Sequence, residues 1–564
     1  MLLNPKAHSR AYPDERSRQI MLDTIAFFEQ KGKRQLKQDS QARTWYADFL
    51  DFQRDCQIFA DLLTPKAYGA SPDARWDTWR NCEFNEILAF YGLPYWYTWQ
   101  VSILGLGPIW MSQNEAQKQR AAQLLRDGAV FAYGLSEREH GADIYSTEMS
   151  LTPQPDGSYR ANGRKYYIGN ANIAPMVSTF GKLADSGDYV FFSADYRHKD
   201  YQLVQNIVDS QMYVGEFVLR DYPVAADEIL SRGQEAWDAC LNTVNVGKYN
   251  LGWASIGVCT HAFYEAIHHA AHRRLYKMSV TDFPHVQQMF VEAYARLVAM
   301  KLFALRAADY QRSATLQDRR YLLYNPVVKM KVTTQGEEVI NLLWDIIAAK
   351  GFEKDTYFEA AARDIRALPK LEGTVHVNIA LIVKFMANYF LNPQAYPEMP
   401  RRDDAADDTF LFQQGPTGGL GQVRFHSYQP TLERWDLPNV RLFREQVATY
   451  RRMLLQATPN DAQQRSTDWM LALGELFTQV VYAQLILENA SIYGVEPELV
   501  EAMAEGWVRD VARHALTLYQ KPQTTAEQAS FCQQLLVRPA SDPGAFGRVW
   551  QSVLALADAY EMSP

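Results

Sequence analysis

The spacing of apolar residues changes twice along this chain of 564 residues, and that double change limits the folds open to it. Between about residues 14 and 128, apolar residues recur every three or four positions, which predicts helices. Residues 147–225 alternate instead between apolar and polar residues in short runs such as DYVFFSADY, which predicts strands. Helical spacing returns near Trp237 and continues to about Tyr389. Few architectures have this order of helices, sheet and helices.

Turn-forming residues place the boundaries. Pro-Asp-Gly at 155–157 and Ser-Gly-Asp at 186–188 separate the alternating runs, and a segment rich in Pro, Asp and Gly after Asn392 is typical of a connector. Helical spacing then resumes. The sequence predicts an α+β multidomain protein with an N-terminal helical domain (1–128), a middle β-barrel domain (129–236), a C-terminal helical bundle (237–392), a linker (393–429) and a helical extension (430–564).

Composition narrows the class of protein. Hydrophobic residues make up 47% and charged residues 22% of the chain, as in globular proteins of aqueous compartments. A net charge of -8 argues against a surface that neutralises nucleic-acid phosphates. The five cysteines are odd in number and never spaced as CxxC, which favours reduced thiols. We expect a cytoplasmic protein without a transmembrane segment.

One short strip carries residues suited to a specific chemistry. In PKLEGTVHVN, residues 369–378, Glu372 precedes Gly373 and Thr374, and Arg363 stands nine residues before Glu372. Removing hydrogens from Cα and Cβ of a thioester requires a base for the α proton and an acceptor for the β hydride. No side chain accepts a hydride, so a flavin or an equivalent group is needed. Taken alone, Glu372 is one of 65 acidic residues, and a surface carboxylate is the ordinary interpretation.

Three further blocks give the strip its context: AYGLSEREHGAD from residue 132, NGRKYYIGN from 162 and HRRLY from 272. In this order and at these separations, the blocks resemble the acyl-CoA dehydrogenase family over about residues 30–390. The resemblance implies FAD as cofactor and Glu372 as the base that takes the α proton of a fatty acyl-CoA. It also implies that the amide beside Glu372 bonds the thioester oxygen, with Gly373 at the substrate and Thr374 at the cofactor. An apolar pocket would raise the pKa of such a glutamate toward neutrality.

The block FAYGLSEREHGAD resembles the family's flavin-contacting turn, ALTEPxxGSD. Two departures stand out: Arg138 replaces the usual Pro, and Ala142 replaces a Ser, which removes one hydroxyl contact to phosphate or thioester. We keep Ala142 as a position beside the substrate. Glycine at 141 permits close approach of a ligand. The resemblance assigns flavin contacts to Tyr133, Leu135, Ser136 and Gly141.

The next block resembles the family motif NGxKxWITN. Tyr167 stands where a Trp shelters one face of the flavin, and Gly169 stands where a Thr hydroxyl bonds the ring nitrogen that receives the hydride. Tyr167 can still cover a ring, whereas Gly169 offers only its backbone N–H. The pair Asn162-Gly163 predicts a hairpin turn.

Two cationic positions also follow from the resemblance. Arg273 stands where the family places an Arg that reaches the flavin pyrophosphate across a subunit interface, and Tyr276 replaces the usual Phe. The alternative for Arg273 is a solvated arginine on a helix. Lys248 stands where many members carry an Arg near the base, which we expect one turn into the helix that follows the sheet.

The weakest match is DIIAAKGF, residues 345–352, where the family has a Gln and two glycines that hold FAD from a neighbouring subunit. Asp345 replaces the Gln, and Ala348 and Ala349 replace the glycines, while Gly351 and Phe352 are kept. Added methyl groups restrict backbone approach, and a carboxylate repels phosphate unless it is paired. Lys350 could compensate. We therefore expect an altered grip on the adenosine diphosphate or an altered subunit arrangement.

Other kinds of site are weaker. His268, His269 and His272 form HHAAH, and two of them are four residues apart, but no carboxylate or cysteine stands at ligand spacing beside them. We predict a polar helix face and no metal. No GxGxxG, GxxxxGK[ST] or GxSxG occurs in a strand-to-helix context. The aromatic run YGLPYWYTW, residues 91–99, could line an acyl tunnel or pack in the core.

The resemblance therefore implies an acyl-CoA dehydrogenase of the long form, acting in fatty acid β-oxidation as a homodimer or homotetramer and passing electrons to an electron-transfer flavoprotein. An acyl-CoA oxidase, in which oxygen reoxidises the flavin, fits the length and the C-terminal helices equally well. A non-catalytic scaffold with weak FAD binding is the third hypothesis, motivated by the changes at 142, 169, 345, 348 and 349. Chain length of the substrate, and coenzyme A against a carrier protein, are left open.

Overall fold

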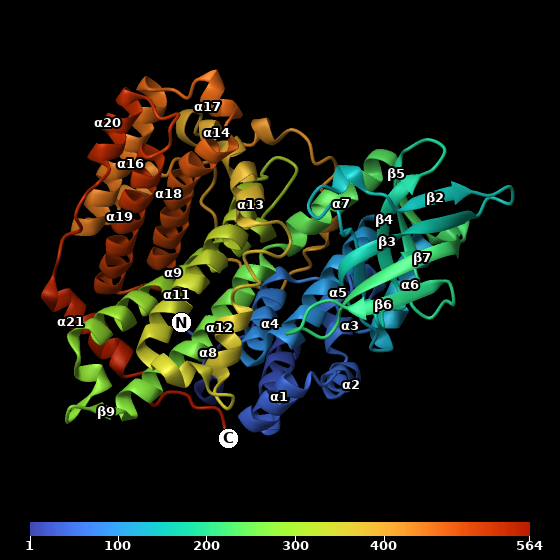
Figure 1. The fold of residues 1–564 in the computed structure, drawn as a ribbon, viewed down its shortest axis with the longest axis horizontal. Coiled ribbons are helices and arrows are strands. Elements are labelled where there is room, and N and C mark those ends of the chain that lie inside the picture. The colour runs from blue at the N-terminus through green and yellow to red at the C-terminus, as the bar shows by residue number, and fades with distance from the viewer. Residues whose placement is uncertain (9) are drawn as a thin grey trace. The chain divides into compact units, whose positions relative to one another are not determined.

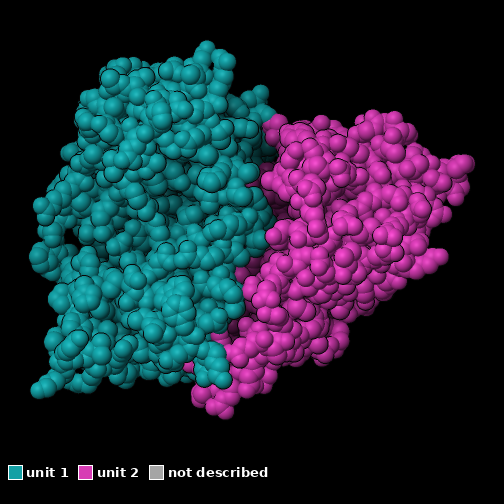
Figure 2. All heavy atoms as spheres, in the orientation of Figure 1, with its two compact units in different colours: residues 1–9, 251–402, 419–562 teal, residues 10–250, 403–418, 563–564 magenta. Residues whose placement is uncertain are grey.

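A computed structural model describes residues 1–8 and 10–564 of the chain (Figure 1). The chain divides into two compact units, coloured separately in Figure 2. Unit 1 comprises residues 1–9, 251–402 and 419–562, and unit 2 comprises residues 10–250, 403–418 and 563–564. Along the chain, N-terminal helices are followed by a sheet, by C-terminal helices and by a further set of helices, so the predicted fold class is confirmed.

Unit 2 begins with helices whose starts are set by capping residues. Asp14 caps α1 (Glu15–Ala42), and Asp77 caps α4 (Thr78–Tyr91), because their carboxylates accept hydrogen bonds from amides of the first turn. All of α4 and nearly all of α5 are buried, as expected for helices inside a core. The remaining helices of unit 2 are α2 (Ala47–Asp55), α3 (Ile58–Leu63), α5 (Leu93–Met111), α6 (Glu115–Arg126) and α7 (Gly233–Gly247).

The aromatic run at the start of α5 packs into this core. Trp96 is fully buried, and its Nε1 donates a hydrogen bond of 2.7 Å to Oδ1 of Asn85. The ring of Trp99 packs 5.1 Å from that of Phe59 and 4.7 Å from that of Phe84, measured between centroids. Of the two interpretations of this run, core packing therefore holds for both tryptophans.

The strands of unit 2 form one sheet in the order β6-β7-β3-β2-β4-β5-β8, with β1 beside β4. Neighbours are antiparallel except for β1–β4 and β2–β4. Alternate side chains such as Val190, Phe192 and Phe217 form the buried core of the sheet. Its strands are β1 (Ala132–Gly134), β2 (Ser150–Pro153), β3 (Tyr159–Gly169), β4 (Val177–Leu183), β5 (Tyr189–Ala194), β6 (Tyr201–Asn206), β7 (Val214–Val224) and β8 (Ile229–Arg232).

One predicted turn is wrong. Asn162 and Gly163 lie inside β3, where the pairing with β7 shifts register, and not at a hairpin turn. A Cβ on Gly163 would lie 2.8 Å from Cα of Met149, so glycine is needed for close approach of backbone. The turn that joins β2 to β3 contains Gly157 at φ +84, within the predicted Pro-Asp-Gly segment.

Unit 1 contains the C-terminal helices. Gly336 lets α11 approach α8, because a Cβ at this position would lie 2.0 Å from Oγ of Ser255. A π-helical turn, Val328–Val332, joins α10 to α11. The helices are α8 (Asn250–His272), α9 (Pro284–Arg312), α10 (Tyr321–Val327), α11 (Thr333–Ile347), α12 (Tyr357–Asp364), α13 (Val375–Ile382) and α14 (Met386–Leu391), and a hairpin of β9 (Arg274–Leu275) and β10 (Met278–Ser279) follows α8.

The segment 393–428 is irregular apart from two short 3-10 turns, Thr409–Phe412 and Leu420–Gln422. After it comes the extension, in which α18 and α19 contact α9. Arg296 of α9 pairs with Asp510 of α19 at 3.2 Å, and this ion pair is buried. The extension comprises α15 (Gln429–Glu433), α16 (Pro438–Gln456), α17 (Asp461–Arg465), α18 (Thr467–Tyr493), α19 (Pro497–Tyr519), α20 (Ala526–Gln534) and α21 (Pro543–Leu554).

Helix α18 is long and apolar enough to cross a membrane, judged by length and composition only. However, 83% of its most apolar window is buried inside the protein, against α9, α13 and α19. Core helices show the same properties, so α18 is weak evidence for a membrane span.

Candidate functional site

A buried carboxylate fixes the loop that follows β1 in unit 2. Oε1 of Glu137 accepts hydrogen bonds from Oγ1 of Thr147 (2.6 Å) and from Nζ of Lys165 (2.7 Å), and Oε2 accepts one from the amide of Glu148 (2.8 Å). The ammonium of Lys165 also donates to the carbonyl of Leu135 at 2.9 Å. The loop that the sequence assigns to flavin contacts is therefore tied to β3.

Burial and pairing shift the pKa values of Glu137 and Lys165 in opposite directions. Burial lowers the pKa of Lys165 below its ordinary value, although the Glu137 carboxylate opposes that shift. Burial alone would raise the pKa of Glu137, but the Lys165 ammonium and the Thr147 hydroxyl outweigh it and hold that pKa below the ordinary value. Removing one partner would leave the other as a buried charge without compensation, which costs about 3–5 kcal/mol.

Strand β3 bulges next to this pair. The pairing of β3 with β7 shifts register between Lys165 and Ile168, and the amide of Tyr166 donates instead to the carbonyl of Ser136 at 2.9 Å. Tyr167 takes a φ of +64 and is 55% exposed. A β-bulge re-aims a side chain in this way. The ring that the sequence assigns to the flavin face is thus presented on the surface of unit 2.

The end of β3 lies tightly against α5. A Cβ on Gly169 would lie 2.5 Å from Cγ2 of Val101 and 2.7 Å from Cε1 of Tyr97, so no side chain fits at this position. The next residue, Asn170, is fully buried and donates to the carbonyl of Phe131 at 2.8 Å. Gly169 can therefore contribute only backbone atoms to a site.

The other predicted flavin contacts, on β1 and directly after it, differ in burial and in hydrogen bonding. Tyr133 is buried, and its hydroxyl donates to the carbonyl of Cys240 at 3.3 Å, so this hydroxyl is used inside the unit. Leu135 and Ser136 are half-buried, and their carbonyls accept the two bonds from β3 described above. Backbone contacts, and the Ser136 hydroxyl, are what this stretch can offer a ligand.

The turn after this stretch is open. Gly141 takes a φ of +44, which favours glycine, and a Cβ on it would meet no other atom within 4 Å. Ala142 beside it is exposed. Arg138, in place of a Pro, donates to Oε2 of Glu216 at 2.9 Å, and its guanidinium lies 4.7 Å from the centre of the Tyr166 ring. The substitution thus anchors the loop to β7 and to the bulge.

Lys248 does not lie where the sequence predicts. Helix α7 already begins at Gly233, directly after β8, so Lys248 is the C-cap residue of that helix and not a residue of its first turn. Even counted from Trp237, where helical spacing becomes visible, Lys248 lies eleven residues into the helix, about three turns, so the prediction is wrong for either start. Lys248 is buried.

In unit 1, the residues Glu372, Gly373 and Thr374 form a turn that starts α13. Glu372 takes a φ of +52 and Gly373 a φ of +88, both in the left-handed region. Thr374 is the N-cap residue, and its hydroxyl oxygen accepts from the amide of Val377 at 3.4 Å. The φ at 373 therefore favours glycine, and the cap position at 374 favours a side chain that can accept a hydrogen bond. Glutamate at 372 has no such local reason, because an L-residue adopts the left-handed region at a cost of about 1–2 kcal/mol. Such outliers gather at functional sites.

Arg363, the second residue of the strip, lies in the last turn of α12. Its Nη1 donates to Oε1 of Glu359 at 3.1 Å, and its Nε donates to Oδ1 of Asp364 at 3.0 Å. Asp364 is buried, so the arginine compensates a charge that would be costly to bury alone. This pair positions the end of α12, from which the chain leads to Glu372.

The altered glycine motif follows α11. Ala348 takes a φ of +54 with a ψ of -136°, a conformation that glycine adopts without strain. The backbone therefore keeps a glycine-like path although the glycine is absent. Gly351 is needed, because a Cβ there would lie 3.1 Å from side-chain atoms of Ile347 and Phe358. The exposed members are Asp345, Ala348, Ala349 and Phe352, while Lys350 donates to Glu353 at 3.0 Å.

Arg273 and Tyr276 lie on the hairpin after α8. Arg273 is exposed, as in the alternative of a solvated arginine, but it directly follows the last residue of α8 and does not lie on the helix. Tyr276 and Lys277 take φ values of +49 and +69, which define a two-residue turn between β9 and β10. Tyr276 is 89% exposed. Both residues point away from the core of unit 1.

Sequence reasoning missed Glu137, Lys165 and Asn170, which hold the loop, the bulge and the end of β3. One signal was readable. In an alternating strand Lys165 falls on the inward side with Ala161 and Tyr159, and an inward lysine requires a buried partner. Its carboxylate partner could not be named from spacing, since Glu137 lies outside the strand.

Comparison with known proteins identifies a matching family and similar proteins. Residues 235–387 match the family described as Acyl-CoA dehydrogenase, C-terminal domain. The short-chain specific acyl-CoA dehydrogenase of Megasphaera elsdenii is 23% identical over 325 residues, which cover 55% of this chain and 82% of that protein. The CarC subunit of the caffeyl-CoA reductase-Etf complex of Acetobacterium woodii is 24% identical over 287 residues, covering 49% and 73%.

The crystal structure of an acyl-CoA dehydrogenase complexed with FAD from Bacillus anthracis matches 99% of this chain and 97% of its own, with a TM-score of 0.75 and 16% identity. The fold is therefore that of an acyl-CoA dehydrogenase, the C-terminal extension included. Residues 235–387 match the acyl-CoA dehydrogenase C-terminal domain family, and about half of the chain is similar to a protein named as an acyl-CoA dehydrogenase. The resemblance found in the sequence is confirmed.

Proposed function

We propose that this protein catalyses FAD-dependent α,β-dehydrogenation of an acyl-CoA thioester to the trans-2-enoyl thioester. The observation that carries the proposal is the turn 372–374. It holds a glutamate at a φ of +52, a conformation that costs free energy, inside a segment matched to the acyl-CoA dehydrogenase C-terminal domain. A carboxylate kept in such a conformation is expected to serve a purpose beyond solvation.

The residues of unit 2 fit a flavin. Gly141 leaves open space where a Cβ would stand, and the bulge presents the Tyr167 ring. Leu135 and Ser136 lie in the stretch whose carbonyls bond to β3 at this bulge. Gly169 supplies backbone only. Bound FAD would supply the hydride acceptor that no side chain provides. In unit 1, Thr374 and Arg273 are the proposed cofactor contacts, and Ala348 keeps the backbone path of the glycine it replaces.

The remaining chemistry belongs to Glu372 and its neighbours. Its carboxylate takes the α proton, which breaks the Cα–H bond, while the β hydrogen leaves as a hydride. The amide at Gly373 would donate to the thioester oxygen and stabilise the developing enolate. We assign Ala142 and Lys248 to the substrate side of the site. A positioned base of this kind contributes about 10²–10⁴-fold to the rate.

Partners follow the same proposal. The Acetobacterium woodii relative is named as a subunit of a complex with Etf, which supports an electron-transfer flavoprotein as electron acceptor. We propose a fatty acyl chain as substrate, β-oxidation as the setting, the cytoplasm as the location and a homodimer or homotetramer as the assembly. The exposed Arg273 and Tyr276 are the residues we expect at the contact between subunits.

The test is an anaerobic titration of the purified flavoprotein with acyl-CoA thioesters of increasing chain length. We expect the flavin absorbance to bleach with saturated thioesters and to stay unchanged with the corresponding enoyl thioesters. Electron-transfer flavoprotein should restore the colour of the reduced enzyme. The variant Glu372→Gln should bind FAD and fail to bleach.

Three outcomes would point elsewhere. Rapid return of colour in air with hydrogen peroxide would favour the oxidase over the dehydrogenase. A colourless protein that cannot take up FAD would favour the scaffold. Bleaching by an acyl-carrier-protein thioester but not by acyl-CoA would move the substrate to the carrier protein.

A further inference from the structure

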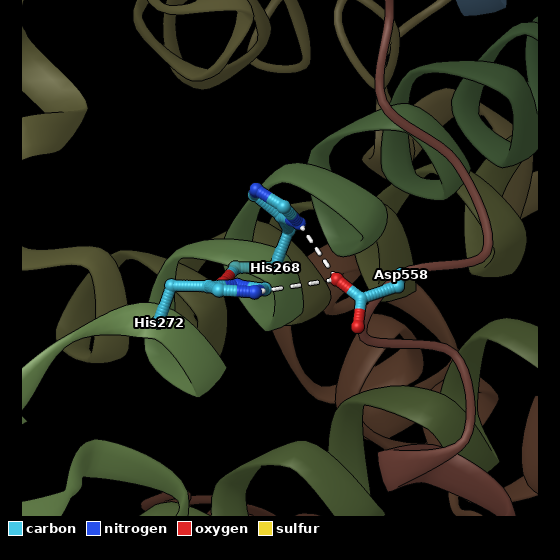
Figure 3. Close-up of side chains that lie close together, drawn as sticks. All are labelled: His268, His272 and Asp558. Atoms are coloured by element: carbon cyan, nitrogen blue, oxygen red, sulfur yellow. Dashed lines mark hydrogen bonds and ion pairs between the residues drawn. The ribbon is translucent and has the colours of Figure 1, made fainter.

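A second cluster of chemically active side chains lies in unit 1, between α8 and the segment 555–562 that follows α21. Figure 3 shows His268 and His272, one turn apart on α8, turned toward the same carboxylate oxygen of Asp558. Nδ1 of His268 and Nε2 of His272 each lie 3.4 Å from Oδ1 of Asp558. The sequence excluded a metal here because it shows no carboxylate near the histidines. The fold supplies one from the far end of the chain.

From this arrangement we propose that His268, His272 and Asp558 bind a divalent transition-metal ion of the zinc type, which fastens the segment 555–562 to α8. Zinc bonds to His nitrogen and Asp oxygen are about 2.0–2.2 Å long, so two donors at the corners of a tetrahedron lie about 3.4 Å apart. Both nitrogen–oxygen separations have that value, and the three donor atoms lie within 4.8 Å of one another. An ordinary N–H···O bond is shorter, about 2.9–3.0 Å.

Hydrogen bonding fixes which nitrogen of His272 can bind a metal. Its Nδ1 lies 2.8 Å from the carbonyl oxygen of His268, and only a protonated nitrogen bonds to a carbonyl. In the neutral ring, the lone pair is therefore on Nε2, which faces Asp558. A lone pair and a carboxylate oxygen that face each other require a cation between them, either a proton or a metal ion.

His268 has a matching arrangement. Its Nε2 lies 3.5 Å from Oε2 of Glu561, and its Nδ1 faces Asp558. A carboxylate beside one ring nitrogen of a histidine orients the other nitrogen toward a metal and raises its basicity. The carbonyl oxygen of Ala557 lies 3.1 Å from the same Nδ1 and accepts its hydrogen bond in the metal-free form. A bound ion would replace that proton, and the Ala557 carbonyl or a water molecule can then take the fourth position.

The segment that carries Asp558 is held in place by contacts that need no metal. Tyr560 is 2% exposed, and its ring packs 5.4 Å from that of His261 and 5.6 Å from that of Tyr264, both on α8. The carbonyl of Ala559 accepts from Nδ2 of Asn4 at 2.9 Å. Asp558 itself is exposed, so an ion can enter from solvent. The donors are thus positioned before the ion arrives.

A second group of His and carboxylate side chains among the described residues, Glu137, His140 and Glu148, does not meet the same conditions. The Lys165 ammonium already lies 2.7 Å from Oε1 of Glu137, so a cation occupies that carboxylate. At the α8 site, in the described part of the chain, two imidazoles lie beside carboxylates. Nitrogen donors select zinc-type ions over magnesium and calcium, which prefer oxygen.

The experiment uses the full chain without an affinity tag, treated with a chelator and then titrated with ZnCl2 or MgCl2 by calorimetry. Metal content after dialysis gives the stoichiometry. We expect one tightly held Zn²⁺ per chain and no response to Mg²⁺. The variants H272N and D558N should each weaken Zn²⁺ binding by at least about tenfold. His285→Ala removes an exposed imidazole of α9 and should leave the binding unchanged.

Thermal unfolding completes the test. Zn²⁺ should raise the melting temperature of the wild type and of His285→Ala but not that of D558N. Equal melting temperatures of the metal-free wild type and D558N would show that the variant folds. If D558N bound Zn²⁺ as tightly as the wild type, or if the wild type bound none, the three side chains would be an ion pair and the proposal would be wrong.

Discussion

Among the turns of unit 1 that hold a residue other than glycine at positive φ, those at Glu372 and Ala348 differ in what the side chain adds. Glu372, at φ +52, brings a carboxylate to the start of α13, whereas Ala348, at φ +54, brings only a methyl group to the end of α11. Both conformations would be less costly for glycine. The difference teaches that backbone strain is informative about function only when the strained residue carries a group that can do chemistry, such as a carboxylate.

The largest effect we expect is the loss of catalytic activity when the carboxylate at 372 is removed. Glu372→Gln keeps the size and the backbone but removes the base, so kcat/KM should fall about 10²–10⁴-fold, which corresponds to about 3–5 kcal/mol at the transition state. Steady-state kinetics with an acyl-CoA measure the change. The matched control Glu398→Gln, an exposed carboxylate of the connector, should keep full activity. Equal activity in all three proteins would remove Glu372 from the mechanism.

The second effect concerns stability. Ala348→Gly relieves a conformation that costs about 1–3 kcal/mol, which stabilises the folded chain. It also raises the conformational entropy of the unfolded chain, which lowers the stability by about 0.4–1 kcal/mol. The free energy of unfolding should therefore rise by about 1 kcal/mol, as measured by denaturant titration. Ala349→Gly is the control, because Ala349 has no positive φ and should lose stability. A loss of stability in both variants would show that Ala348 is not strained.

The third prediction concerns Gly373, which lies between Glu372 and the helix cap Thr374. Gly373→Ala places a Cβ at φ +88, where the nearest atom, Nδ2 of Asn378, lies 3.4 Å away, so backbone strain and not a clash is the expected cost. That strain is about 1–2 kcal/mol, partly offset by the smaller entropy of the unfolded chain, and leaves a net loss of about 1 kcal/mol. Denaturant titration checks it. A gain in stability would contradict the conformation assigned to the turn.

The smallest effect concerns the cap of α13. Thr374→Val removes a hydroxyl whose bond to the Val377 amide is long, 3.4 Å, so the loss should be at the low end for N-caps, about 0.5 kcal/mol. Thr374→Ser keeps the hydroxyl and serves as the control. Should Val cost more than about 2 kcal/mol, the Thr374 hydroxyl would be making a stronger contact than the cap alone.

Much of the architecture was predictable because it rests on local patterns. The change from helical to alternating spacing marks the passage from α6 to the sheet, and the Pro-Asp-Gly segment marks the turn after β2. The boundaries of α7 and the position of Asn162-Gly163 were not predictable in this way. The first depends on a helix start without apolar periodicity, and the second on the approach of Met149, a contact between strands.

The candidate site shows the same division. The order of Glu372, Gly373 and Thr374 could be read directly, since glycine and threonine have fixed roles in a turn and a cap. The Glu137–Lys165 pair and the cluster of His268, His272 and Asp558 could not be found by spacing, because each joins residues from separate elements. In both cases, contact in three dimensions decides whether a buried or clustered charge has a partner.

The contact between Gly169 and α5 restricts how this protein can change. A threonine at 169 would overlap Val101 and Tyr97, so the hydroxyl that the resembled motif carries there cannot be introduced by one substitution. It would need smaller residues at 101 and 97 in the same molecule, and those residues alone would leave a cavity beside the glycine. The three positions are therefore linked, and engineering of this end of β3 must treat the sheet and the helix as one unit of design.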